Sequence, residues 1–129
     1  MLLVIDTNII VNAIKSGDKQ SKSYQLMRDV MLGKHTMCIS LAIMDEYEDV
    51  LHRPQLKLNR KLVDMFLAVI RLQSVWIEPL PTVPEKIEMR DEDDRVFFDV
   101  AKCLNVKLIT RNFKDYPVHE LITSIDELY

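Results

Sequence analysis

Three acidic residues far apart in the chain have the chemistry to bind a divalent metal ion together. The first, Asp6, directly follows the apolar run 2–5, which is typical of a strand buried on both faces. In an open α/β sheet, ligands bind just beyond the carboxyl ends of the strands. Asp6 therefore occupies a ligand-binding position. Capping of the next helix explains this residue alone equally well, because Asp, Thr and Asn all favour that place.

Helical periodicity places the other two acidic residues near apolar faces. On a predicted helix over 41–52, at about 100° per residue, the apolar side chains share one face and Glu46 lies at its edge. On a predicted helix over 94–104, Asp94 falls on the apolar arc, whereas Arg95 points elsewhere. Charged groups are rarely buried unpaired, and the sequence offers Asp94 no evident cation. A metal ion would supply the missing positive charge.

A capping box is the competing explanation for the acidic residues before the last helix. In it, Asp91 caps the helix and Asp94 closes the box three residues later, with both carboxylates near the positive end of the helix dipole. This explanation suits Asp91 better than Asp94. Carboxylates that meet repel one another and raise each other's pKa, and a divalent cation reverses that preference. Oxygen ligands without a nearby histidine favour Mg or Mn over zinc.

The order of the predicted elements indicates how the acidic residues come together. Strands and helices alternate, which predicts a three-layer α/β/α sandwich with a central, mainly parallel sheet. Ser40 and Asn59 are the expected N-caps of two helices. Parallel strands would bring Asp6, Glu46 and Asp94 to one end of the sheet. The predicted strands are 2–5, 37–40, 75–78, 107–110 and 122–125, and the predicted helices are 9–15, 22–32, 41–52, 60–73 and 94–104.

Composition excludes several classes of protein. With 129 residues and 48% hydrophobic content, a single domain over 1–129 is expected. No stretch approaches the roughly 18 apolar residues of a membrane span, and no basic leader precedes the first apolar run, so a cytoplasmic protein without membrane contact is expected. Two glycines cannot form a P-loop or a GxGxxG turn. Cys38 and Cys103 are expected to be buried free thiols.

Taken in order, these motifs resemble those of the PIN-domain nucleases. The resemblance runs from residue 2 to about residue 116, and is closest to the bacterial group described as toxins of toxin-antitoxin systems. The motifs that carry it are Asp6-Thr7-Asn8, the stretch 40–54, the stretch 91–101 and the stretch 108–112. The resemblance implies an α/β/α sandwich with an acidic, Mg- or Mn-dependent site, holding one or two ions, that cleaves RNA.

The resemblance also implies roles for individual residues. The positions that match the family's metal-binding and catalytic acids are Asp6, Glu46 and Asp94. Asp91 would be an auxiliary acid. Where the family often has a fourth acidic residue, this chain has Asn112, and Asp115 is close enough in sequence to compensate. Polar neighbours expected to support these ligands are Thr7, Asn8, Thr110 and Asn112, and cations expected to contact RNA are Arg111, Lys114, Arg53 and Lys57.

Two other protein classes fit the sequence less well, and a third alternative shares the PIN-like fold but has impaired catalysis. A response-regulator receiver would need a phosphoacceptor Asp after a middle strand, where this chain has Ser40-Leu41-Ala42. A haloacid-dehalogenase-type phosphatase would need Asp at position 8, which is Asn8. The remaining alternative is a PIN-like binding or scaffold module with impaired catalysis. The resemblance further implies a small antitoxin partner and a homodimer.

Overall fold

The computed structural model describes residues 1–84 and 86–129, and its described strands form one parallel sheet. The order across the sheet is β3-β2-β1-β4-β5, and every neighbouring pair is parallel. β1 lies at the centre, between β2 and β4. The strands are β1 (Leu2–Ile5), β2 (Thr36–Ile39), β3 (Val75–Trp76), β4 (Lys107–Thr110) and β5 (Ile122–Ser124). The predicted parallel α/β fold is confirmed.

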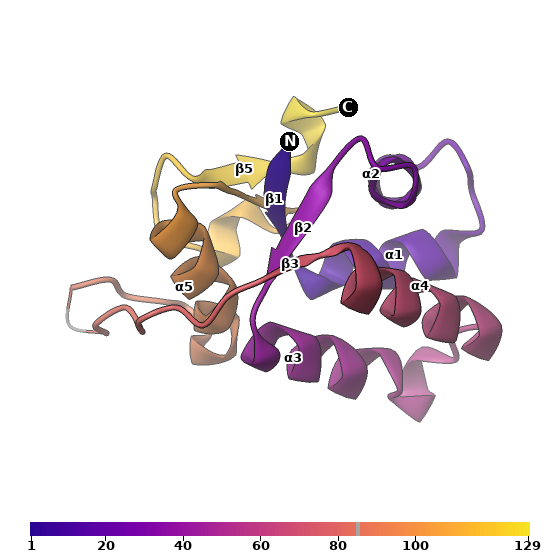
Figure 1. Cartoon of the computed structure of the whole chain (residues 1–129), viewed down its shortest axis with the longest axis horizontal. Helices are drawn as coiled ribbons and strands as arrows, with labels where there is room; N and C mark the ends of the chain where they lie inside the picture. Colours follow the sequence, from indigo (N-terminus) through magenta and orange to yellow (C-terminus); the bar gives the residue numbers. More distant parts are fainter. Residues whose placement is uncertain (85) are drawn as a thin grey trace.

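Helices cover both faces of the sheet. Figure 1 shows α1, α2 and α4 on one face, α5 on the other, and α3 running below the carboxyl ends of the strands. Because the chain moves from β1 to β3 in one direction and then crosses back to β4, its helices divide between the two faces. The helices are α1 (Thr7–Ser16), α2 (Lys22–Met31), α3 (Leu41–Leu51), α4 (Arg60–Gln73) and α5 (Arg95–Leu104).

Polar side chains set the start of several helices. The Ser40 hydroxyl accepts a hydrogen bond from the backbone amide of Ile43 at 3.2 Å, and the Asn59 side chain accepts one from Leu62 at 3.2 Å. Both act as the predicted N-caps. Short 3-10 turns follow or precede the main elements, namely η1 (Pro54–Leu56), η2 (Glu92–Asp94), η3 (Phe113–Asp115) and η4 (Ile125–Glu127).

Two expectations about local structure were wrong. β3 ends at Trp76, two residues before its predicted end, and is followed by a segment that contains Pro79; proline cannot donate a hydrogen bond to a neighbouring strand. Cys103 is exposed, whereas Cys38 is buried as expected. Cys103 follows Lys102 on the outer side of α5, opposite the buried Ala101, so an apolar neighbourhood in the sequence did not predict burial.

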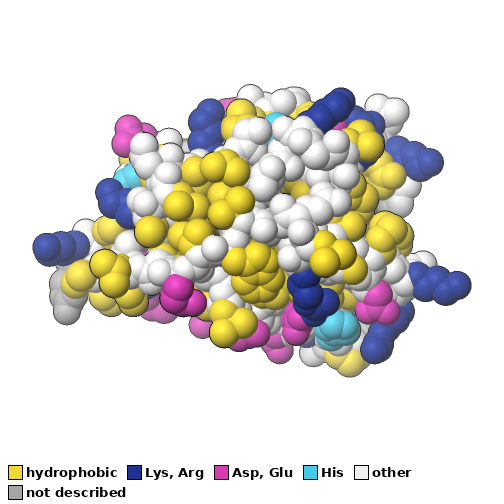
Figure 2. Space-filling view, viewed as in Figure 1, with side chains coloured by type: hydrophobic (Ala, Val, Ile, Leu, Met, Phe, Trp, Pro, Cys, Tyr) yellow, Lys and Arg dark blue, Asp and Glu magenta, His cyan; other side chains and the backbone are white. Residues whose placement is uncertain are grey.

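The sheet is enclosed by apolar side chains on both faces. Leu3, Val4 and Ile5 of β1 are fully buried, as are Leu108 and Ile109 of β4. Burial on both faces explains why these strands read as uninterrupted apolar runs. Hydrophobic side chains are also visible at the β3 edge of the molecule (Figure 2), where Val75 and Trp76 are partly exposed. None of the described helices has both the length and the apolar character that crossing a lipid bilayer requires.

Candidate active site

Asp6 lies at the end of the central strand and is 5% exposed. It occupies the N-cap position of α1, yet within the described residues its side chain makes no capping hydrogen bond. Its backbone amide instead donates to the Ile109 carbonyl at 3.0 Å, and its Oδ2 accepts a hydrogen bond from the Thr110 hydroxyl at 2.9 Å. The neighbouring strand β4 therefore orients Asp6. Burial raises the pKa of its carboxyl, and the backbone amides of Asn8 and Thr7 at the start of α1 also lower this pKa in part.

Thr110 connects Asp6 to the loop after β4. Its side chain is fully buried, and its hydroxyl oxygen accepts a hydrogen bond from the Asn112 backbone amide at 3.0 Å while the hydroxyl donates to Asp6. Asn112 itself is exposed. Of the other polar neighbours expected to support the acids, Asn8 is exposed, and Thr7 has a buried hydroxyl that finds no partner among the residues described.

Two buried tyrosines that sequence reasoning missed surround Asp6. The Tyr47 hydroxyl donates to the carbonyl of Ile5 at 2.5 Å, and its ring packs against Phe97 with centroids 5.8 Å apart. The Tyr116 hydroxyl interacts with Asp6 but does not reach full hydrogen-bond geometry. Burial is the main reason why the pKa of Asp6 is raised, and the Thr110 and Tyr116 hydroxyls offset it in part. Tyr47 lies among the apolar residues of the helix 41–51, which accounts for its burial, whereas its contact with Ile5 depends on long-range packing.

Asp94 is the acidic residue with the largest electrostatic perturbation in this region. It is half-buried at the junction of η2 and α5, and among the described residues its side chain makes no capping hydrogen bond. Burial and then the negative charges of Asp6, Asp91, Asp115 and Glu46 raise the pKa of Asp94 to about 7. The fold thus brings four other acids within electrostatic range of Asp94, and these five acids come from four separate parts of the chain.

The other acidic residues differ in their surroundings. Burial and then the charge of Asp93 raise the pKa of the half-buried Glu46. Asp91 is exposed, and its Oδ1 accepts a hydrogen bond from the Asp93 amide at 2.9 Å, so it caps the turn η2. The expected capping box is not formed within the described residues, because Asp94 is itself the N-cap residue of α5 and its side chain makes no capping bond. Asp115 is half-buried and lies 3.7 Å from Arg90. Figure 2 shows acidic side chains along the lower rim, where Figure 1 places the first turns of α3 and α5.

These carboxylates have the chemistry of a magnesium or manganese site. Their donors are all oxygen atoms, which hard divalent cations prefer, and burial, joined by nearby acids at Glu46 and Asp94, raises the pKa of Asp6, Glu46 and Asp94, so their ionised forms are disfavoured without a cation. In the described part of the chain, no three Asp, Glu, His or Cys side chains are close enough to enclose an ion. The donor set therefore fits such a cation, and ligation would require the side chains to move closer.

Two polar hollows with basic side chains are present beside the acidic cluster and along α3. The first is lined by Asn8, Val11, Asn12, Lys15, Arg111 and Asn112. The second is lined by Leu51, His52, Arg53, Pro54, Lys57, Leu58, Arg60 and Val63. Arg53 is close enough to Glu46 to lower its pKa and also pairs with Asp49 at 2.9 Å. Of the cations expected to contact RNA, only Lys114 lines neither of these two hollows.

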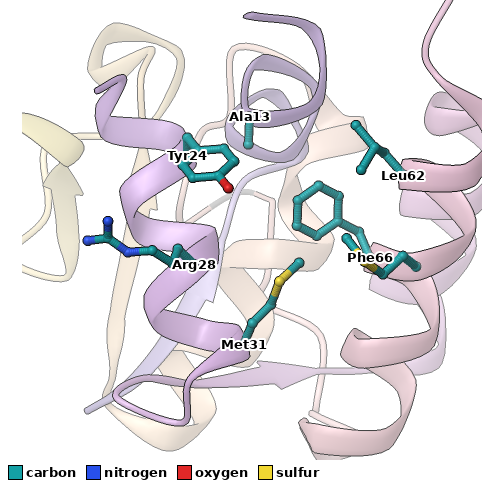
Figure 3. A pocket seen from close by; sticks show the side chains of 7 residues that line it. Ala13, Tyr24, Arg28, Met31, Leu62 and Phe66 are labelled. Atoms are coloured by element: carbon teal, nitrogen blue, oxygen red, sulfur yellow. The ribbon is translucent and has the colours of Figure 1, made fainter. Parts of the chain in front are cut away.

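A third hollow is apolar and separate from the acidic residues. It lies between α1, α2 and α4, with Tyr24 and Arg28 on one side and Phe66 on the other (Figure 3). Its lining residues are Ala13, Tyr24, Arg28, Met31, Leu62, Met65 and Phe66. Because this lining contains no carboxylate, the hollow is not part of the candidate metal site.

Comparison with known protein families identifies the fold. The family model described as the PIN domain matches residues 2–114. The chain belongs to the PIN domain family. No curated protein and no solved structure matches it. Membership confirms the resemblance seen in the sequence and implies that this PIN domain is a nuclease of a family that typically uses divalent metal ions.

Proposed function

We propose that this PIN domain is a metal-dependent endoribonuclease that cleaves RNA phosphodiester bonds, and that it is the toxin of a toxin-antitoxin pair. The observation that carries the nuclease proposal is that Asp94 lies within electrostatic range of Asp6, which follows the central strand of a parallel sheet, and has a pKa raised to about 7 by burial and by four other acids. Perturbed carboxyls that lack cationic partners are typical of functional sites.

In this proposal the side chains position a metal ion and the substrate. Asp6, Glu46 and Asp94 hold one or two Mg or Mn ions, with Asp91 and Asp115 as further candidate ligands. A bound ion supplies Lewis-acid polarisation of the phosphodiester and a lowered pKa for the attacking water. The hydrogen bond from Thr110 fixes the orientation of the Asp6 carboxylate, as outer hydrogen bonds commonly do for metal ligands.

The two polar hollows supply candidate contacts for the RNA backbone. Arg111 lines the hollow beside Asn8 and Asn112, and Arg53 and Lys57 line the hollow at the end of α3. Lys114 is exposed on η3, after β4. Cations at these places can neutralise phosphates without reading base identity. The proposal therefore predicts cleavage that weakens with rising salt concentration.

Cleavage of mixed RNAs in the presence of Mn tests the proposed activity. The wild type is compared with Asp6→Asn, which keeps an oxygen acceptor for Thr110 but removes the charge, and with Asp45→Asn, a matched change at an exposed acid on α3. We expect Asp6→Asn to lose cleavage and Asp45→Asn to retain it, with both melting near the wild-type temperature. Equal cleavage by Asp6→Asn and the wild type would reject the site.

A scaffold or binding module with impaired catalysis is the second candidate function. Asn112 stands where an acid is frequent in the family, and no three acidic, His or Cys side chains among the described residues are close enough to enclose an ion. Calorimetric titration with Mn separates the two functions. A nuclease should bind Mn at micromolar to millimolar concentrations, whereas a scaffold should show no saturable binding.

The proposed partners follow from the proposed activity. An active ribonuclease would damage the RNA of the cell that makes it, so we propose a small antitoxin that covers the acidic cluster, and self-association into a homodimer. A gene for a small DNA-binding protein next to this one, and co-purification of the two products, would support the antitoxin. Light scattering of the purified chain measures its oligomeric state, and a monomer at all concentrations would contradict the homodimer.

A further inference from the structure

A proline-containing connector joins β3 to the turn that carries the acidic residues of α5. Its described residues, 77–84 and 86–90, precede Asp91, and Figure 1 shows the connector extending from β3 past the first turn of α5. Prolines at positions 79, 81 and 84 favour an extended conformation in this segment. The connector therefore passes the start of α5, where Asp94 is located.

Arg95 joins this connector to η2. Arg95 is only 8% exposed. Nη1 donates to the Thr82 hydroxyl at 2.8 Å, and Nη2 donates to the Ile87 carbonyl at 2.7 Å. The guanidinium also forms a two-pronged pair with Glu92, with Nε–Oε2 and Nη2–Oε1 distances of 2.5 and 2.9 Å. Among the described residues, this one side chain thus binds two sites on the connector and one in η2.

Asp99 completes the attachment of the connector to α5. Its Oδ1 accepts hydrogen bonds from the Thr82 amide at 2.8 Å and from the Thr82 hydroxyl at 2.7 Å. The Thr82 hydroxyl therefore donates to Asp99 and accepts from Arg95. Asp99 lies one helical turn after Arg95, so Thr82 is held by two residues on the same side of α5. The connector and the first turns of α5 form one hydrogen-bonded unit.

The same unit fixes the backbone next to Asp94. The Asp94 amide donates to the Asp91 carbonyl at 3.1 Å, and the Arg95 amide donates to the Glu92 carbonyl. The Asp94 carboxylate, by contrast, makes no capping bond within the described residues, and it is within electrostatic range of four other acids. Repulsion between like charges would move this carboxylate away from Asp6 unless its backbone were held.

We propose that Arg95 is a positioning residue for the proposed metal site: by binding Glu92, Thr82 and Ile87 at once, it holds the turn 91–94 so that the Asp94 carboxylate stays within electrostatic range of Asp6. This inference rests on the proposed metal-dependent function. Residues that orient metal ligands contribute to metal affinity although they do not touch the ion. Arginine suits this role because its planar fork donates in several fixed directions, whereas lysine presents a single ammonium group.

Manganese affinity measured by calorimetry tests the role of Arg95. Arg95→Lys keeps the charge but cannot reproduce the three attachments, and Thr82→Val removes only the shared hydroxyl. We expect a roughly tenfold weaker Kd for Arg95→Lys, at the lower end of the effect of outer hydrogen-bond partners, and a smaller loss for Thr82→Val. The matched control is Arg71→Lys. Arg71 forms a surface ion pair with Glu48, on the side of α3 opposite Glu46.

Destabilisation alone must be separated from a positioning effect. All variants are titrated well below their melting temperatures, together with Asp29→Ala, which weakens a hydrogen-bonded cluster at the other end of the sheet. Weaker Mn binding by Arg95→Lys and Thr82→Val, with wild-type affinity for Asp29→Ala and Arg71→Lys, supports the inference. If Arg95→Lys does not fold, the Mn affinity of Thr82→Val decides whether the inference holds.

Two results would overturn the inference. The first is an unchanged Mn Kd in a folded Arg95→Lys variant, or in Thr82→Val where Arg95→Lys does not fold, while the wild type binds Mn. The second is an equal loss of affinity in Asp29→Ala, which would show that general stability sets the Kd. A wild type that binds no Mn is a distinct outcome, because it contradicts the proposed function itself and removes the basis of the inference.

Discussion

Two buried aspartates at opposite ends of the sheet have opposite electrostatic environments. Asp29, near the start of β2, is 8% exposed, and its Oδ2 accepts a hydrogen bond from the Tyr129 hydroxyl at 2.5 Å. This bond, with the nearby positive charges of Lys34 and Arg28, lowers the pKa of Asp29. Asp6, at the carboxyl end of β1, is 5% exposed, and burial raises its pKa despite the hydrogen bond from Thr110.

The difference separates a structural acid from a candidate functional one. The fold itself supplies a donor and cations to Asp29, so its charge is matched within the protein. Around Asp6 the fold supplies Asp94, whose own pKa is raised by burial and then by the charge of Asp6. Negative charge gathered in a partly buried place must be balanced from outside, by protons or by a cation. The same residue type at similarly low exposure thus meets two different electrostatic environments, because burial dominates at Asp6 and the Tyr129 hydrogen bond dominates at Asp29.

The largest expected effect is on catalysis. Asp6→Asn should reduce Mn-dependent RNA cleavage by roughly 100-fold or more, because it removes a proposed metal ligand. This loss is at least as large as the greatest effect usual for removing a residue that hydrogen-bonds a metal ligand. Asp29→Asn should leave the rate constant unchanged, since Asp29 lies at the opposite end of the sheet. Single-turnover cleavage assays measure both. Equal losses in the two variants would remove the functional distinction between the two aspartates.

Stability should respond in the reverse order. Asp29→Ala should lower the free energy of unfolding by about 2 kcal/mol, the size expected for losing a hydrogen bond to a charged group, because the half-buried Tyr129 hydroxyl loses its carboxylate acceptor. Asp6→Asn should leave stability unchanged or higher, since it removes a charge that burial disfavours. Urea denaturation followed by circular dichroism gives both values. A loss for Asp6→Asn as large as that for Asp29→Ala would contradict the comparison.

The pH dependence of stability should also differ between the two regions. With a native pKa of about 7 against an ordinary 3.8, Asp94 binds more protons when folded than when unfolded, so its contribution to stability declines as the pH rises between these values. The lowered pKa of Asp29 acts oppositely, because its contribution is present above 3.8 and is lost as the pH falls through the native pKa.

Melting temperatures measured across this pH range in the presence of a chelator reveal the contributions of Asp94 and Asp29 to stability. The Asp94→Asn variant should show a smaller decline toward neutral pH than the wild type, and added Mn should reverse the wild-type decline, because the ion favours the ionised carboxylates. The same slope in the wild type and in Asp94→Asn, both without metal, would contradict the raised pKa of Asp94.

The smallest effect is expected at an exposed ion pair near Asp29. Lys22 lies 2.6 Å from Asp126, with side chains 44% and 71% exposed. Lys22→Ala should cost about 0.5 kcal/mol or less, as is usual for exposed pairs, although Asp126 and Tyr129 belong to the same segment. The urea titration that serves Asp29→Ala measures this value too. A cost equal to that of Asp29→Ala would show that docking of residues 125–129 as a whole, and not burial of Asp29, sets stability there.

Much of the fold could be predicted from the sequence because it depends on local patterns. Uninterrupted apolar runs predicted β1 and β4, and the polar residues Ser40 and Asn59 predicted the helix starts. The convergence of acids followed from topology, since the carboxyl ends of parallel strands share one edge of the sheet. The ligand roles of those acids stay predictions, because proximity in the fold does not establish metal binding.

The contacts that sequence reasoning missed depend on long-range packing. A helical wheel placed Arg95 away from the apolar arc, yet the connector covers that side of α5 and buries the guanidinium against Thr82. Nothing local indicates that a proline-rich segment will pack there. Tyr116 is comparable, because its position near Asp6 depends on the path of the loop after β4. Thr82 and Asp99, polar residues on both sides of the contact, were the available signals.

The hydrogen bond from Tyr47 to the Ile5 carbonyl has a consequence for ion selectivity. Tyr47 adjoins Glu46 and Ile5 adjoins Asp6, so this bond sets the separation of the two backbones that carry these acids. Burial keeps the phenol neutral, because it raises the pKa of Tyr47 well above its ordinary value. In the proposed metal site, cations of different ionic radii would therefore be accommodated by the side-chain torsions of Glu46 and Asp94, because the Tyr47 hydrogen bond holds together the backbones next to Glu46 and Asp6.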